Sequence, residues 1–163
     1  MSADAPSGHG WQWVLLAYRL PREPSTPRIA LWRKLKRLGV VQIGDGLVGL
    51  PLDSRTREAL EWIAEEVLEA GGEAAIWLAA SPSRQQEREL ASRMAEAIAA
   101  EYRAVAEAAQ AVAGKAPAVR RRTLARLRRE LQRIRRRDFF PPPERRQAEE
   151  AVEGLARALE IAA

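Results

Sequence analysis

The order of strand and helix signals between residues 11 and 80 restricts the possible folds of this chain more than any other feature of the sequence. Residues 11–20, WQWVLLAYRL, contain the aromatic residues and continuous apolar run that indicate a largely buried strand. A helix is then predicted with Thr26 as its N-cap, Pro27 in the first helical position and Gly39 just after the last turn. The region therefore opens with a strand followed by a helix.

The same region continues with two more strands, a second helix and a final strand. The pair Asp45-Gly46 separates two short apolar runs and predicts a hairpin turn. A second helix follows a cap at Asp53 or Ser54, and residues 73–80 form the last apolar segment. This β-α-β-β-α-β order is that of the ferredoxin-like split βαβ arrangement, in which two helices cover one face of a four-stranded antiparallel sheet. We therefore expect the α+β fold class.

The C-terminal half of the chain is predicted to be helical. Apolar residues recur at helical spacing over residues 84–113, 118–137 and 144–161. We expect a disordered N-terminal tail, a ferredoxin-like domain and a helical extension with an arginine-rich helix, over residues 1–10, 11–80 and 81–163 respectively. Each predicted helix has a narrow apolar stripe, which favours packing on another helix, on the open face of the sheet or across a dimer. We therefore predict a homodimer.

The segment from residue 120 to residue 137 concentrates the positive charge of the chain. Ten of its eighteen residues are arginine, and only Glu130 opposes them. On a helix, one stripe is formed by the apolar residues Leu124, Leu127, Leu131 and Ile134. Nine of the ten arginines project opposite or beside this stripe, and only Arg120 projects onto it. The segment is thus predicted to bury a leucine seam and to expose guanidinium groups.

A surface of one charge sign suits phosphate, because a guanidinium group can donate two parallel hydrogen bonds to it. We therefore predict a nucleic-acid-binding face, with DNA as the partner, formed by Arg121, Arg122, Arg128, Arg129, Arg135 and Arg136. The same pattern also fits a solvated face that is partly neutralised by acidic residues in the 101–107 and 144–153 regions. The face could instead bind a smaller oxyanion or an acidic protein partner, and Trp11 or Trp13 could stack on bases.

Residue types used in catalysis are scarce in this sequence. It contains no cysteine, and the only histidine is His9, in the polar N-terminal segment. Asp45 and Asp53 lie near strand ends and could hold a metal, but turn and cap roles are commoner for such residues. No phosphate-binding loop, signal peptide or long apolar run is present. We therefore expect a cytoplasmic protein that is not an enzyme, with no metal, no cofactor and no membrane association.

Several sequence blocks together resemble the N-terminal domain of the chromate-resistance regulator ChrB family. They are YRLPREPSTPR, WRKLKRLG, LPLDSRTREALEWIAEEV and GGEAAIW, with a basic helix leading into an aspartate-aromatic pair in LRRELQRIRRRDFF. The resemblance implies a bacterial cytoplasmic protein of the chromate response that acts in transcription. Full-length members carry a second, chromate-resistance domain, so this chain is expected to be a form without it. The resemblance brings no catalytic residues to carry over.

Two kinds of function follow from these observations. The first is a chromate-response regulator that binds nucleic acid through the arginine-rich helix. The second is an oxyanion-responsive or scaffold protein that acts in chromate resistance without binding DNA directly. In this case chromate or sulfate is the effector. For the second function, the candidate oxyanion-binding residues are Arg19, Arg22 and Arg28.

Overall fold

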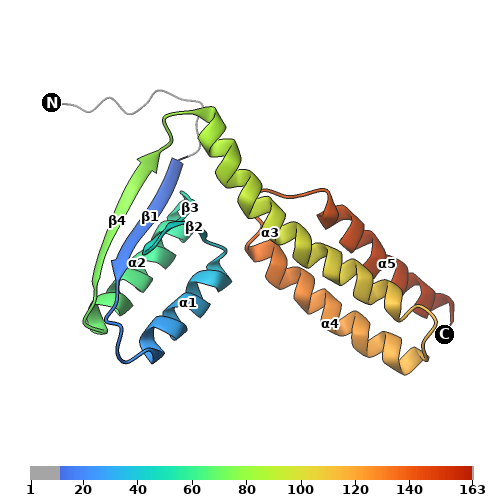
Figure 1. The fold of residues 1–163 in the computed structure, drawn as a ribbon. Helices are drawn as coiled ribbons and strands as arrows, with labels where there is room; N and C mark the ends of the chain where they lie inside the picture. The colour runs from blue at the N-terminus through green and yellow to red at the C-terminus, as the bar shows by residue number, and fades with distance from the viewer. Residues whose placement is uncertain (1–11, 163) are drawn as a thin grey trace. The chain divides into compact units, whose positions relative to one another are not determined.

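A computed structural model of the protein describes residues 12–162, which fall into two compact units divided after Ala91. The first unit contains four strands, β1 (Gln12–Arg19), β2 (Val41–Gly44), β3 (Leu47–Pro51) and β4 (Glu73–Ala80), and two helices, α1 (Thr26–Leu38) and α2 (Ser54–Glu69). The strands form an antiparallel sheet in the order β2-β3-β1-β4. Figure 1 shows α1 and α2 along the same side of this sheet. The expected α+β class is confirmed, and the predicted disorder of residues 1–10 lies outside the described residues.

The core of the first unit lies between the sheet and its two helices. In β1, Val14 pairs with Leu50 of β3 and Leu16 pairs with Val48, and all four side chains are fully buried. Directly opposed residues of an antiparallel pair point to the same face, so these four form one apolar surface. The helices contribute the buried residues Leu31, Leu35, Leu60, Ile63 and Val67.

Local signals fix the ends of these elements. Asp53 caps α2, because its carboxylate accepts a hydrogen bond from the backbone N–H of Thr56 at 2.7 Å and the Thr56 hydroxyl accepts one from the Asp53 N–H at 2.9 Å. Gly39 ends α1 in the left-handed region, with φ of 81°. The prediction of Thr26 as N-cap is wrong by one residue, because the N-cap is Ser25. With Ser25 as the N-cap, Pro27 occupies the second helical position. Proline fits there because the backbone N–H groups of the first turn have no partner inside the helix.

The predicted hairpin turn at Asp45-Gly46 is present between β2 and β3. Gly46 has a φ of 69°, and a Cβ atom at this position would lie 2.4 Å from the carbonyl oxygen of Tyr18. The Tyr18 N–H donates to the Gly46 carbonyl at 2.8 Å. Both the backbone conformation and the close approach to β1 therefore require glycine here.

The C-terminal part of the chain contains three helices, α3 (Arg84–Ala111), α4 (Pro117–Arg136) and α5 (Glu144–Ile161). In the second unit, apolar residues of all three helices form one buried cluster, which includes Ile98, Tyr102, Val105, Leu124, Leu127, Leu131, Ile134, Ala148, Val152 and Leu155. The helices thus pack on one another, which is one of the arrangements that their apolar stripes favoured. None of the helices in residues 12–162 is both long enough and apolar enough to cross a membrane.

Candidate nucleic-acid interface and anion pocket

The leucine seam of α4 is buried as the sequence predicts. Leu127 is 1% exposed and Ile134 is fully buried, and both belong to the core cluster of the second unit. Arg120, the one arginine that projects onto the seam, is half-buried, and its Nε atom has no hydrogen-bond partner in the part of the chain that is described. The helical projection therefore places the α4 side chains correctly.

The structure places five of the six predicted phosphate-binding arginines in solvent without an acidic partner in residues 12–162. These five are Arg121, Arg122, Arg128, Arg129 and Arg136. The sixth, Arg135, donates two hydrogen bonds to Oε1 of Glu149 on α5, at 2.9 and 3.2 Å. Arg126, which is not among the six, is also exposed and has no acidic partner in this range.

The six arginines form two rows on α4, because residues seven apart lie almost on the same side of a helix. One row contains Arg121, Arg128 and Arg135, and of these Arg128 and Arg135 line a groove with Glu149 and Glu153 of α5. The other row contains Arg122, Arg129 and Arg136, and none of the three lines that groove. We call this second row the outer row, and its charge is not compensated within the described residues.

Acidic residues neutralise part of the segment from residue 120 to residue 137, as expected for a partly neutralised solvated face. Arg137 makes a bidentate pair with Glu101 of α3, at 2.6 and 2.7 Å, and Arg133 pairs with Glu130. With Arg135, three of the ten arginines form ion pairs within residues 12–162. The more exposed pairs, those of Arg133 and Arg135, contribute little to stability, about 0–1 kcal/mol each, whereas the Arg137 side chain is only 18% exposed.

A buried polar network closes the C-terminal end of α4, and the sequence pattern did not predict it. The Tyr102 hydroxyl donates to Oδ2 of Asp138 at 2.7 Å, and the Arg145 guanidinium lies 3.5 Å from the same oxygen. The Asp138 side chain is fully buried. The pKa of Tyr102 is raised, first by burial and then by the hydrogen bond to Asp138. The aspartate that directly follows the basic helix was the only signal of this network in the sequence.

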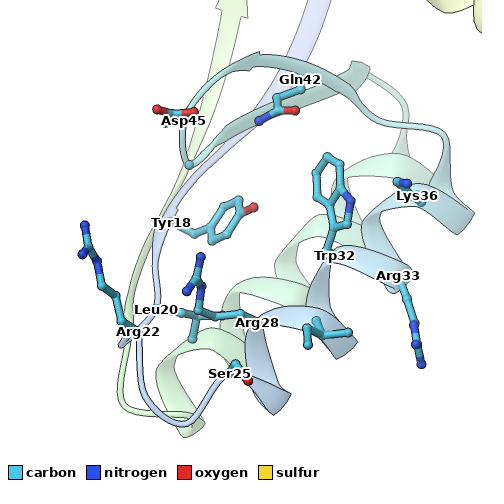
Figure 2. Close-up of a pocket in the computed structure, with 12 residues that line it drawn as sticks. Tyr18, Leu20, Arg22, Ser25, Arg28, Trp32, Arg33, Lys36, Gln42 and Asp45 are labelled. Atoms are coloured by element: carbon cyan, nitrogen blue, oxygen red, sulfur yellow. The ribbon is translucent and has the colours of Figure 1, made fainter.

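A pocket of about 870 Å³ lies in the first unit between α1 and the turn that joins β2 to β3 (Figure 2). Tyr18 of β1 and Trp32 of α1 supply aromatic rings, and Ile29 adds exposed apolar surface. Four cationic side chains also line the pocket, Arg22, Arg28, Arg33 and Lys36, and Asp45 is the only acidic residue in the lining. We call this space the α1 pocket.

The three candidate oxyanion-binding arginines are not all brought together. Arg22 and Arg28 line the α1 pocket, but Arg19 does not. Successive strand residues point to opposite faces of a sheet, so Arg19 faces away from the side on which its neighbour Tyr18 enters the pocket. Figure 2 shows Arg28 and Tyr18 directed into the pocket, whereas Arg33 points away from it.

Charge and aromatic contacts shape the α1 pocket. The Lys36 Nζ atom lies 5.6 Å from the centroid of the Trp32 ring, within the range of a cation–π interaction. Burial raises the pKa of the Tyr18 hydroxyl, and the nearby Arg28 charge lowers it by a smaller amount. Tyr18 is therefore neutral at physiological pH and can donate a hydrogen bond.

The remaining sequence candidates have structural positions. Trp13 is buried, and Trp11 and His9 lie outside the described residues. Asp53 caps α2 and Asp45 lies in the hairpin turn. Within residues 12–162 there is no group of three or more histidine, aspartate and glutamate side chains that could hold a metal ion.

Comparison with known proteins places most of the first unit and the whole of α3 in one family. The family model described as "Protein ChrB, N-terminal" matches residues 28–113. Protein ChrB of Cupriavidus metallidurans is 30% identical to this chain over 100 residues, a match that covers 61% of this chain and 27% of that protein. The chain therefore spans about a quarter of the length of this relative. No solved structure matches the chain.

Proposed function

Since the chain belongs to the family of ChrB N-terminal domains, we propose that it is a regulatory protein of chromate resistance that binds DNA through α4. The family match supports the regulatory role. The outer row of α4 supports the mode of binding, because Arg122, Arg129 and Arg136 are exposed and lack acidic partners within residues 12–162. Nucleic-acid binding by this face is not sequence-specific in itself, because guanidinium groups bind phosphates that are common to every sequence.

The main support for DNA binding is that the three arginines of the outer row form no ion pair among the described residues. Arginines that stabilise the second unit, such as Arg135 and Arg137, pair with acidic residues of neighbouring helices. The outer row makes no such pair among the described residues, so its positive potential is directed to solvent. Its members are seven residues apart, which separates them by about 10 Å along the helix axis. This spacing gives a line of charge that can follow a phosphate backbone.

The test is the triple variant R122Q/R129Q/R136Q, since glutamine keeps the helix propensity and removes the charge. Binding to duplex DNA is measured at several salt concentrations for the parent and the variant. Each phosphate contact contributes about 0.9 to the slope of log affinity against log salt, so losing three contacts flattens the slope by about 2.7. We expect affinity to fall alike for unrelated DNA sequences, with unchanged thermal stability.

A matched control separates the outer row from net charge. The variant R84Q/R88Q/R157Q also removes three exposed arginines that have no acidic partner within the described residues, but none of them lies on α4. We expect it to keep most of the parent affinity and slope. Equal weakening in both variants would contradict a specific role for α4. If R122Q/R129Q/R136Q bound DNA as tightly as the parent, the outer row would be a solvated surface with no role in DNA binding, and the proposal would be wrong.

The second candidate function is an oxyanion-responsive or scaffold protein without direct DNA binding. The observation that favours it is the presence of Arg22 and Arg28 together in the α1 pocket, with a single acidic residue in the lining. Titration of the protein with chromate and with sulfate tests this function. Binding of chromate that is lost in R28Q, with no DNA binding by the parent, would favour it over the first candidate.

We make four further proposals, on fold, location, oligomeric state and catalysis. The first unit is ferredoxin-like, supported by its element order and by the antiparallel pairing of β1 with both β3 and β4. The protein is a cytoplasmic homodimer without catalytic activity, and exposed Trp77 on β4 supplies apolar surface for a dimer contact. Light scattering at tens of micromolar tests the dimer, and a monomer at that concentration contradicts it.

A further inference from the structure

The α1 pocket combines positive charge with aromatic walls, and neither the family match nor the proposed DNA binding accounts for this combination. Its volume of about 870 Å³ falls within the usual range of small-molecule sites, about 300–1,000 Å³. We propose that the pocket binds a small ligand in which an aromatic ring is joined to a negatively charged group, such as an aryl or nucleoside phosphate. This proposal does not depend on DNA binding by α4.

The end of the pocket near Ser25 is suited to the anionic group. Arg22 and Arg28 both line the pocket, the Arg28 side chain is directed into it, and neither forms an ion pair with the described residues. Ser25 is the N-cap of α1, and its side chain makes no capping hydrogen bond. The first N–H groups of a helix have no partner inside the helix and, together with the helix dipole, favour an anion at this position. The inward-directed guanidinium of Arg28 and the uncapped start of α1 therefore both favour an anion in the pocket, and Arg22 is a further cation of the lining.

The other side of the pocket is suited to a ring. Tyr18 and Trp32 enter from β1 and α1, and the cation–π contact with Lys36 orients the indole. Ile29 is 52% exposed beside them, which leaves apolar surface that a bound ring would cover. Because the Tyr18 hydroxyl is neutral and makes no hydrogen bond with another described residue, it can donate to the ligand.

The arrangement of charge argues against a bare tetrahedral oxyanion as the ligand. Arg28, Trp32 and Lys36 are four residues apart and lie on one face of α1, so the Cα atoms of Arg28 and Lys36 are about 12 Å apart along the axis, with Trp32 between them. Their positions, about two helical turns apart, favour a ligand longer than a single small ion. A chromate or sulfate ion would also leave most of the pocket and both aromatic rings unused. A ligand with a ring and a charged group uses all of these features.

The experiment compares probes that carry the ring, the charge or both. Calorimetric titrations of the full chain use phenyl phosphate and adenosine monophosphate, with adenosine for the ring alone and with phosphate, sulfate and chromate for the charge alone. We expect at least one of the two aromatic phosphates to bind at least 10-fold more tightly than every single-feature probe. Equal or tighter binding of an inorganic oxyanion overturns the proposal, and so does the absence of binding by both aromatic phosphates at millimolar concentration.

Variants locate the binding in the α1 pocket. R28Q removes the inward-facing guanidinium, and W32L removes the ring, so each is expected to weaken binding at least 10-fold. The matched control is R37Q, which removes the same charge from an exposed position of the same helix that does not line the pocket. Circular dichroism shows whether each variant is folded. If R28Q and R37Q weakened binding equally, the loss would reflect net charge alone, and that result would refute the proposed site.

The two proposals fail independently. The triple variant R122Q/R129Q/R136Q is expected to bind the aromatic phosphate as the parent does, which excludes α4 as the place of binding. R28Q is expected to bind duplex DNA as the parent does. Loss of ligand binding in the triple variant assigns the phosphate to α4 and overturns the α1 pocket proposal without touching DNA binding.

Discussion

The hydrogen bond from Tyr102 to Asp138 can be removed without disturbing the packing around it, which makes Tyr102→Phe an informative change. Both side chains are fully buried, and the donor and acceptor oxygens are 2.7 Å apart. Phenylalanine keeps the ring and deletes only the hydroxyl. The Asp138 carboxylate then keeps its ion pair with Arg145, at 3.5 Å, but loses the shorter of these two contacts.

The expected loss of stability follows from the charge of the acceptor. A hydrogen bond to a charged group contributes about 1.5–3 kcal/mol, and its removal leaves a buried oxygen without that donor. We expect Tyr102→Phe to lower the free energy of unfolding of the second unit by about 2 kcal/mol. For a unit of 72 residues, 92–163, this corresponds to a fall in melting temperature of roughly 8–16 °C.

The assay uses two spectroscopic signals that report different parts of the chain. All five tryptophans lie in residues 1–91, so their fluorescence follows the first unit, whereas far-ultraviolet circular dichroism follows the helices of both units. We expect Tyr102→Phe to shift the circular dichroism transition more than the fluorescence transition. A change in unfolding free energy below about 0.5 kcal/mol would refute the assigned role of this hydrogen bond.

The same variant predicts a change in alkaline stability. Burial and Asp138 raise the pKa of Tyr102, so the native state holds the phenolic proton more tightly than the unfolded state, whose pKa is about 10. The parent is therefore fully stabilised below about pH 10 and loses stability as the pH rises beyond it. Tyr102→Phe removes this component, and its alkaline transition should be shallower. An identical alkaline transition in both proteins would contradict this assignment.

Three other substitutions test the core, a cap and a turn, each by urea unfolding. Leu127→Ala opens a cavity in the second unit and is expected to cost about 2.7–5 kcal/mol, and a cost below about 1 kcal/mol would contradict the packing of the seam. Asp53→Ala removes the capping box of α2 and should cost about 0.5–2 kcal/mol, with Asp53→Ser restoring most of it. Gly46→Ala places a Cβ atom against the Tyr18 carbonyl and should cost more than about 1 kcal/mol, and parent-like stability would contradict the turn geometry.

Features that depend on a few neighbouring residues were predictable from the sequence. The cap at Asp53 or Ser54, the helix end at Gly39, the Asp45-Gly46 turn and the seam through Leu127 all follow from residue type and spacing, and the structure selects Asp53 as the cap. In each case the interaction lies within one element or one turn. The Thr26 cap was misplaced because Pro27 fits either of the first two helical positions.

Features that depend on packing between elements were not predictable in the same way. From helical spacing alone, Arg129 and Arg135 are both expected to bind phosphate. The fold distinguishes the two, because Arg135 forms an ion pair with Glu149 of α5. In the same way, Arg19 is close to Tyr18 in sequence but points to the opposite side of the sheet. The spacing of four between Arg28 and Trp32 was a visible signal of the α1 pocket, but its opposite wall comes from the sheet.

The length of the outer row sets a footprint on nucleic acid. From Arg122 to Arg136 the row covers two heptads of α4, about 21 Å along the helix axis. Each strand of duplex DNA presents one phosphate per 3.4 Å of axis, so this length matches roughly six base pairs. In a series of duplexes of increasing length, the observed affinity should therefore rise steeply up to about six base pairs. Beyond that length, it should rise only in proportion to the number of overlapping positions at which the protein can bind.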